Sequence, residues 1–174
     1  MSTARIPVPR TEELRDDVAQ LLPLIAPPGR EPARTMAVLA RQPELLGPFL
    51  SWAAALALHG VLAHREHEIL ALRVAVNCGS EFEWAEHVEY AGDAGLSDVE
   101  ITAVREKGAD GPWTPIEAAL LRAADELHAT TDVSDANWSV LAGHYGEDAL
   151  VEILFVVGQY TMLSMVANAA GISA

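Results

Sequence analysis

Apolar residues recur along most of the chain at the three- and four-residue spacing that places them on one face of a helix. Capping and breaking residues divide this pattern into segments. Ser97 and Thr114 are each followed three residues later by glutamate, with Pro115 at a first helical position, and Gly95 and Gly111 fall where segments stop. No alternating Val/Ile/Thr-rich run bounded by turn residues competes with this pattern. The sequence therefore predicts an all-α fold.

The predicted helices follow one another closely from residue 33 onward. We expect them near residues 33–41, 43–58, 63–77, 81–94, 97–107, 115–130, 135–144 and 147–170. Residues 1–32 form an N-terminal arm in which only residues 11–22 show a helical stripe, and the breaker Pro27-Pro28-Gly29 follows it. Without an internal repeat or a linker, residues 33–174 are predicted to be one helical domain.

The last predicted helix requires a test for membrane insertion. Residues 153–173 carry no charge and are long enough to span a bilayer. They also contain Gln159, Asn168 and several small residues, and no basic residues flank them. We interpret this segment as a helix buried in the core or in a subunit interface.

The charge balance narrows the choice of partners. The net charge is −14, from 25 acidic and 11 basic residues, and Lys107 is the single lysine. Nucleic acids and anionic membranes attract basic surfaces, so neither is an expected partner. One cysteine, Cys78, allows no intramolecular disulfide, and the N-terminus lacks the apolar core of a signal peptide. We therefore expect a cytoplasmic protein that acts on a small molecule.

Candidate chemistry is concentrated in residues 65–87, where two predicted helices meet at Cys78-Gly79. The first helix carries Glu68 and Arg73. On the second, three- and four-residue spacing places a polar and aromatic set on one face: Ser80, Glu83, Trp84 and His87. A carboxylate one turn from an imidazole can fix its tautomer, so Glu83 and His87 are a candidate general acid/base pair, with Glu68 as a third titratable group.

Structural explanations compete with this functional one. Ser80 and Glu83 have the spacing of a capping box for the second helix. Trp84 and Cys78 are residue types that often pack in cores, and a glutamate–histidine pair at this spacing can be a surface contact. A metal-dependent enzyme is a further alternative, because His64, His67 and Glu68 have helix-compatible spacing and His87 could join them.

Residues 65–87 closely resemble the signature of the carboxymuconolactone decarboxylase family, which includes the alkylhydroperoxidase D-like proteins. The similarity extends over about residues 40–172 through Trp113, Trp138 and the segments 124–127 and 158–160. The resemblance implies a single-domain helical bundle with a helical hairpin at the site. It also implies assembly into homo-oligomers, commonly trimers or hexamers.

The peroxidase branch of the family has a Cys-x-x-Cys-x-x-x-His pattern with a glutamate twelve residues before the first cysteine. Counted back from His87, the two cysteine positions hold Ser80 and Glu83, and the upstream glutamate is Glu68. Dithiol peroxide reduction needs a thiolate and a resolving thiol, which serine and glutamate do not supply. The resemblance therefore argues against a dithiol peroxidase.

The decarboxylase branch implies cofactor-free acid/base chemistry on a small carboxylated or enolisable molecule: decarboxylation, isomerisation or lactone processing. On this basis the expected catalytic residues are Glu68, Glu83 and His87, with His87 as proton donor oriented by Glu83. Substrate contacts are expected from Arg65, Ser80 and Trp84. Arg65 is alternatively expected to pair with Glu68, and Arg73 with Glu81 or a helix end. A peroxidase-related or inactive oligomeric binding protein is the remaining alternative.

Overall fold

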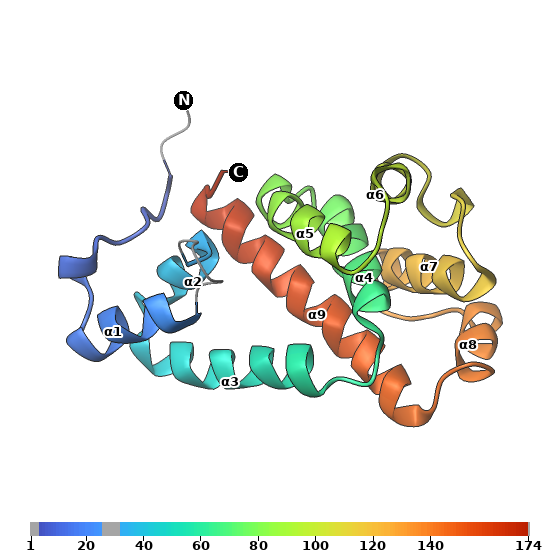
Figure 1. The fold of residues 1–174 in the computed structure, drawn as a ribbon, viewed down its shortest axis with the longest axis horizontal. Coiled ribbons are helices and arrows are strands. Elements are labelled where there is room, and N and C mark those ends of the chain that lie inside the picture. The colour runs from blue at the N-terminus through green and yellow to red at the C-terminus, as the bar shows by residue number, and fades with distance from the viewer. Residues whose placement is uncertain (1–3, 26–31, 174) are drawn as a thin grey trace. The chain divides into compact units, whose positions relative to one another are not determined.

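The computed structural model describes residues 4–25 and 32–173, and within these ranges it contains helices and no strand (Figure 1). The all-α prediction is confirmed. The α-helices are α1 (Asp16–Ile25), α2 (Arg34–Leu39), α3 (Pro43–His59), α4 (His64–Asn77), α5 (Glu81–Asp93), α6 (Asp98–Glu106), α7 (Pro115–Thr130), α8 (Asp135–Ala142) and α9 (Glu147–Ala170). From α2 onward each helix lies close to a predicted range, and side-chain caps mark the starts of α5, α6, α7 and α8.

Two compact units divide the chain: residues up to 59 together with 166–173, and residues 60–165. The predicted boundary between residues 32 and 33 stays a prediction, and the breaker Pro27-Pro28-Gly29 lies outside the described residues. In the first unit, residues of the predicted arm pack into a small core with Ala40 and Leu46, through Val18 and Leu22. The stripe predicted at residues 11–22 is a 3-10 turn, Thr11–Glu13, followed by α1, because the backbone is extended at Leu14.

In the second unit, α4 is the central helix and packs against α5, α6 and α7. Its body is almost fully buried, as expected for a helix that is apolar on most sides. The core that joins these four helices is formed by Ile69, Leu72, Ala91, Leu96, Ile101, Val104 and Leu121. Side chains of α4 therefore have fixed neighbours on three sides.

Two arginines of α4 bond to α6 and α7, and their carboxylate partners differ from those expected. The Arg65 guanidinium donates to Glu100 (2.5 Å), Glu117 (2.7 Å) and a backbone carbonyl, so its predicted pairing with Glu68 is wrong. The Arg73 guanidinium donates to both carboxylate oxygens of Asp125, at 2.5 and 3.0 Å. These partly buried, charge-assisted bonds hold α4 in place.

Glu81 was the other partner expected for Arg73. Its carboxylate instead accepts from Arg105 of α6 at 3.0 Å. The predicted Arg73–Glu81 pair is therefore wrong, and the alternative, a helix end, is the one found: Arg73 donates to the Val104 carbonyl in the last turn of α6.

The α4–α5 hairpin closes through a Schellman motif. Gly79 adopts a left-handed φ of 60°, and its N–H donates to Val76 while the Ser80 N–H donates to Ala75. Ser80 then caps α5, because its Oγ accepts from the Glu83 N–H at 3.4 Å. The capping box is only half formed, since no bond returns from the Glu83 carboxylate to the backbone of Ser80. That carboxylate is directed into the protein instead.

The C-terminal helix, α9, is long and apolar enough to cross a bilayer by length and composition alone. Half of its most apolar window is buried inside the protein. Within residues 147–165, the buried face includes Ile153, Val156, Tyr160 and Ser164. These contacts support the interpretation of α9 as a core helix of a helical fold.

Candidate acid/base site

His87 and Glu68 form the closest ionisable pair of the site. The Nδ1 atom of His87 on α5 lies 2.7 Å from Oε2 of Glu68 on α4. Both side chains are largely buried, with 9% and 12% of their surfaces exposed. When ionised, the Glu68 carboxylate can only accept, so Nδ1 carries the shared proton. This assignment corrects the expectation that Glu83 orients His87, since spacing along α5 could not reveal a partner on α4.

Glu83 lies on the other side of the imidazole. Its Oε2 is 4.0 Å from Nε2 of His87, which is too long for a hydrogen bond. The residue is 3% exposed, and its Oε1 has no hydrogen-bond partner among the residues that the structure describes. His87 therefore stands between two carboxylates, bonded to one and separated from the other.

Burial and charge set the protonation of this group. Desolvation raises the pKa of Glu83 to about 7, against a smaller lowering by His87. Burial by itself lowers the pKa of His87, but the hydrogen bond to Glu68 and the charges of Glu68, Glu83 and Glu86 outweigh it, so the pKa of His87 lies above its ordinary value. Near neutral pH, Glu83 can therefore gain or lose a proton, and His87 holds its proton more tightly than an ordinary histidine does.

Two further residues join the cluster. Nε2 of His67 on α4 lies 2.8 Å from the hydroxyl of Tyr160 on α9, and both side chains are buried. The Tyr160 ring packs edge-on against His87, with centroids 4.5 Å apart. Sequence reasoning considered His67 only as a metal ligand and Tyr160 only as part of the family resemblance. No local spacing links α4 to α9, so nothing in the sequence pattern predicted this contact.

In this arrangement, Nε2 of His87 can give a proton to a bound molecule or take one from it. With Nδ1 bonded to Glu68, neutral His87 presents a lone pair at Nε2, and protonated His87 presents an N–H there. Glu83 beyond it can hold a proton of its own. An oxygen placed between the two groups could receive hydrogen bonds from both, as an enolate requires.

The three residues expected to contact substrate have other roles in the structure. Arg65 bonds to two carboxylates, and Ser80 is 1% exposed and caps α5. Trp84 packs against the core that joins α4 to α6, and the Arg105 guanidinium lies 4.1 Å from its ring centre. The structure thus brings Glu68, Glu83 and His87 together, and places these three residues in other contacts.

The metal alternative finds no support in the geometry. Within the described part of the chain, no group of three or more histidine, cysteine, aspartate or glutamate side chains is arranged to hold a metal ion. His67 faces Tyr160, His87 faces Glu68, and His64 is exposed at the start of α4.

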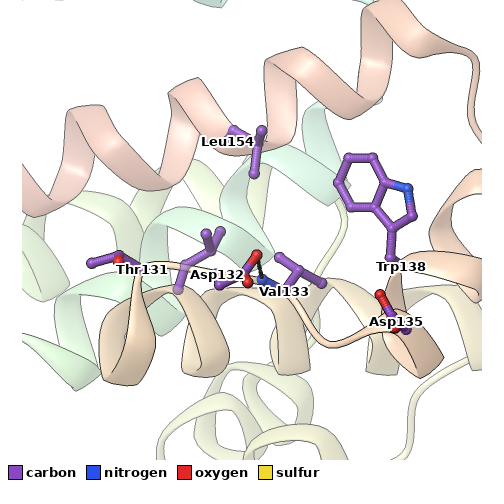
Figure 2. A pocket seen from close by; sticks show the side chains of 7 residues that line it. Thr131, Asp132, Val133, Asp135, Trp138 and Leu154 are labelled. Carbon is purple, nitrogen blue, oxygen red and sulfur yellow. Dashed lines mark hydrogen bonds between the residues drawn. The ribbon is translucent and has the colours of Figure 1, made fainter.

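A separate open pocket of about 400 Å³ lies elsewhere in the second unit (Figure 2). Its walls come from the end of α7, the following loop, α8 and α9: Leu127, Thr131, Asp132, Val133, Asp135, Trp138 and Leu154. Figure 2 shows Leu154 of α9 across from the loop and Trp138. None of the acid/base residues lines this pocket.

Solved structures of similar fold include two uncharacterised peroxidase-related proteins. The one from Ralstonia eutropha JMP134, described as an alkylhydroperoxidase AhpD core, has a TM-score of 0.85 at 19% identity, covering 99% of this chain and 93% of that one. The one from Silicibacter sp. TM1040 has a TM-score of 0.86 at 16% identity, covering 98% and 91%. A protein of unknown function from Agrobacterium tumefaciens has a TM-score of 0.71 at 22% identity, covering 78% and 93%. At these identities the likeness concerns the fold.

The family comparison covers the helices that build the site. Residues 43–126 match the model of the carboxymuconolactone decarboxylase family, a range that includes α4, α5 and the residues Glu68, Glu83 and His87. No curated protein sequence matches the chain. Residues 43–126 are thus similar to the carboxymuconolactone decarboxylase family, and the chain has the all-helical fold of the alkylhydroperoxidase D-like proteins.

Proposed function

We propose that this protein is a cofactor-free acid/base enzyme that moves a proton at a carbon next to the carbonyl of a small, enolisable molecule such as a lactone. The observation that carries the proposal is the 2.7 Å bond between Glu68 and His87, which leaves Nε2 directed toward Glu83. The match of residues 43–126 to a family that is named for a lactone decarboxylase supports it.

In the proposed reaction, Nε2 of neutral His87 takes a proton from the substrate carbon next to the carbonyl. The electron pair of the broken C–H bond forms an enolate with that carbonyl. Protonated Glu83 donates a hydrogen bond to the enolate oxygen, and His87 returns the proton to a carbon of the same system. In the decarboxylating version, the C–C bond to carbon dioxide breaks instead. The electron pair then stays on carbon as the enolate, and protonated His87 supplies the proton.

The charges around His87 favour an uncharged substrate over a carboxylate. The charges of Glu68 and Glu86 act on the imidazole, and the two arginines of α4 are already paired with Glu100, Glu117 and Asp125. A carboxylated substrate would meet like charges without a guanidinium to bind it. Proton transfer within a neutral lactone or ketone fits the site better than decarboxylation.

The proposal can be tested with a panel of small lactones and ketones in D₂O, with carboxylated lactones included. We expect the protein to accelerate exchange of the proton next to the carbonyl, followed as loss of its ¹H NMR signal, most strongly for uncharged compounds. Release of carbon dioxide from a carboxylated lactone would indicate the decarboxylating version. Rates equal to the protein-free rates across the panel would reject the proposal and favour a binding protein.

A peroxidase-related function is the second candidate, because two proteins of the same fold carry that description and the chain has one thiol. Cys78 Sγ lies 3.9 Å from Nδ1 of His128, which could accept its proton. The thiolate would attack the peroxide, the O–O bond would break, and a sulfenic acid and an alcohol would form, to be reduced by an external thiol. Burial raises the pKa of Cys78, which disfavours the thiolate.

We expect no thiol-dependent consumption of an organic hydroperoxide above the rate measured for Cys78→Ser. The reason is that the raised pKa keeps the thiol protonated and no second cysteine is present to resolve a sulfenic acid. Peroxide loss should be followed with dithiothreitol as reductant. Rapid consumption by the wild-type protein that Cys78→Ser abolishes would establish the peroxidase instead.

We also propose that the protein acts in the cytoplasm and associates with copies of itself through an exposed apolar stripe on α9. The stripe is formed by Val151, Leu154, Phe155, Met162 and Met165. Each copy carries a net charge of −14, so contact is least repulsive where no charge is present, and residues 153–173 carry none.

Replacing Met162 with glutamate should convert the assembly to a smaller species, because it places a carboxylate in the stripe. Size-exclusion chromatography with light scattering gives the mass. The matched control is Val99→Glu, which changes an exposed apolar residue on α6, outside the stripe, and should leave the mass unchanged. A wild-type protein that is already monomeric at all concentrations would contradict self-association.

A further inference from the structure

Four side chains form a series of contacts that begins and ends on α4, called the circuit below: Glu68, His87, Tyr160 and His67. It starts at Glu68 on α4, whose carboxylate bonds to Nδ1 of His87 on α5. The His87 ring meets the Tyr160 ring of α9 at an angle of 81°. The Tyr160 hydroxyl then returns to α4 at His67, the residue next to Glu68. His87 and Tyr160 are thus each held from two sides.

A single hydrogen bond does not fix an imidazole. The bond between Nδ1 and Glu68 holds one edge of the His87 ring, but the outer torsion of a histidine side chain is broad, so the ring can still rock about Cβ–Cγ while that bond bends. The perpendicular Tyr160 ring, 4.5 Å away, limits this rotation. Tyr90, one turn further along α5, provides a more distant second ring at 5.7 Å. With the ring held, Nε2 stays directed toward Glu83.

Tyr160 is itself fixed in place. Its hydroxyl lies 2.8 Å from Nε2 of His67, and the two rings are nearly perpendicular with centroids 5.5 Å apart. Burial lowers the pKa of His67 and raises that of Tyr160 well above its ordinary value. Both groups therefore stay uncharged near neutral pH, joined by one hydrogen bond. They can orient His87 without adding a charge beside it.

We propose that Tyr160, anchored by His67, is a positioning residue that holds the His87 imidazole with Nε2 directed toward Glu83. This role deepens the proposed function and rests on it, because orientation of Nε2 matters only if His87 transfers a proton there. Tyr160 acts through His87 and is not itself assigned contact with the substrate.

The test compares two substitutions at Tyr160 with a matched control. Tyr160→Phe keeps the ring against His87 and removes the bond to His67, and Tyr160→Leu removes both. Tyr145→Phe also deletes a tyrosine hydroxyl that donates to a residue of α4, Glu66 at 2.7 Å, but outside the circuit. Long-range ¹H–¹⁵N spectra of the histidine side chains, recorded across a pH series, report the tautomer and titration midpoint of each imidazole.

We expect the His87 signals, assigned by their loss in His87→Gln, to shift in Tyr160→Phe and to shift further and broaden in Tyr160→Leu. The His67 signals should shift in both variants, and Tyr145→Phe should leave His87 unchanged. On any compound that the wild-type protein turns over, Tyr160→Phe should lower kcat with little change in KM. If Tyr160→Leu does not fold, Tyr160→Phe alone decides.

An unchanged tautomer and midpoint of His87 in folded Tyr160→Phe would overturn the positioning role. This result does not depend on turnover. A wild-type protein inactive on the whole panel would reject the proposed function whatever the spectra show. Conversely, an active protein whose His87 signals ignore Tyr160 would keep the proposed function and lose only this inference.

Discussion

Replacing His87 with glutamine should lower the rate of proton exchange by about 10²- to 10⁴-fold, the usual contribution of a positioned acid/base group. Glutamine can still bond to Glu68 and fills similar space, so the hairpin should remain folded. It has no group that takes up and releases a proton near neutral pH. The measurement is the D₂O exchange assay on the best compound of the panel.

His64→Gln is the matched control for this experiment. His64 is an exposed histidine of the same helix hairpin and lies outside the contacts of the acid/base cluster. We expect its exchange rate to equal that of the wild-type protein, and circular dichroism should show both variants folded. Full activity in His87→Gln would remove His87 from the mechanism. Equal losses in both variants would point back to the metal alternative.

The pH profile of exchange offers a check on the same assignment. Its base, neutral His87, forms as pH rises through a pKa that lies above the ordinary histidine value. The hydrogen bond from Glu83 requires the protonated acid, which is lost above about pH 7. The rate should therefore rise and then fall with pH, because the two requirements oppose each other.

Local signals account for how well the helices could be predicted. Ser97, Thr114 and Pro115 mark helix starts and Gly79 and Gly95 lie just after helix ends, and each acts within a few residues of its position. Gly111 directly follows a short 3-10 turn, whereas α6 ends at Glu106, one residue before its predicted end, and Gly108 has the left-handed conformation. A short 3-10 turn, Gly108–Asp110, separates the two positions.

The site could be predicted only in part. The four-residue spacing of Glu83 and His87 placed both side chains toward the same neighbours, and the hairpin brought Glu68 to them. Which carboxylate bonds to the imidazole depends on the angle between α4 and α5, and this angle is set by packing and not by spacing. The partners of Arg65 and the contact of Tyr160 with His67 join residues far apart in sequence. Contacts between residues far apart in sequence produce no regular spacing from which they could be predicted.

Glu83→Gln should make the protein more stable above pH 7 while impairing exchange. The unfolded chain holds the Glu83 proton only below its ordinary pKa of 4.5, and the folded protein holds it up to about pH 7. Stability associated with this proton is therefore complete below pH 4.5, is lost as pH rises through 7, and is constant above. The rise of the Glu83 pKa from 4.5 to about 7 corresponds to about 3 kcal/mol of folding free energy, lost when Glu83 ionises in the folded protein.

Above pH 7, the free energy of unfolding of Glu83→Gln should exceed that of the wild type by about 2 kcal/mol. This is less than the full value of about 3 kcal/mol, because the buried glutamine amide also needs hydrogen bonds. Urea unfolding of both proteins at one protein concentration, from pH 4.5 to 8.5, measures it. The difference in free energy of unfolding should be smallest at pH 4.5, grow to about pH 7 and then level off. Glu106→Gln, an exposed carboxylate on α6, should give a difference that does not change with pH.

Replacing Glu83 also removes one of the charges that raise the pKa of His87. This second effect also makes the stability advantage of Glu83→Gln larger at high pH. A histidine whose folded pKa is raised contributes stability below its ordinary value that is lost as pH rises through the folded value. In Glu83→Gln the pKa of His87 is raised less, so less folding stability is lost as pH rises. A pH-independent difference, or a less stable variant at pH 8, would show that Glu83 is an ordinary structural carboxylate. The expected result instead identifies a residue kept at the expense of stability, as residues with a catalytic role often are.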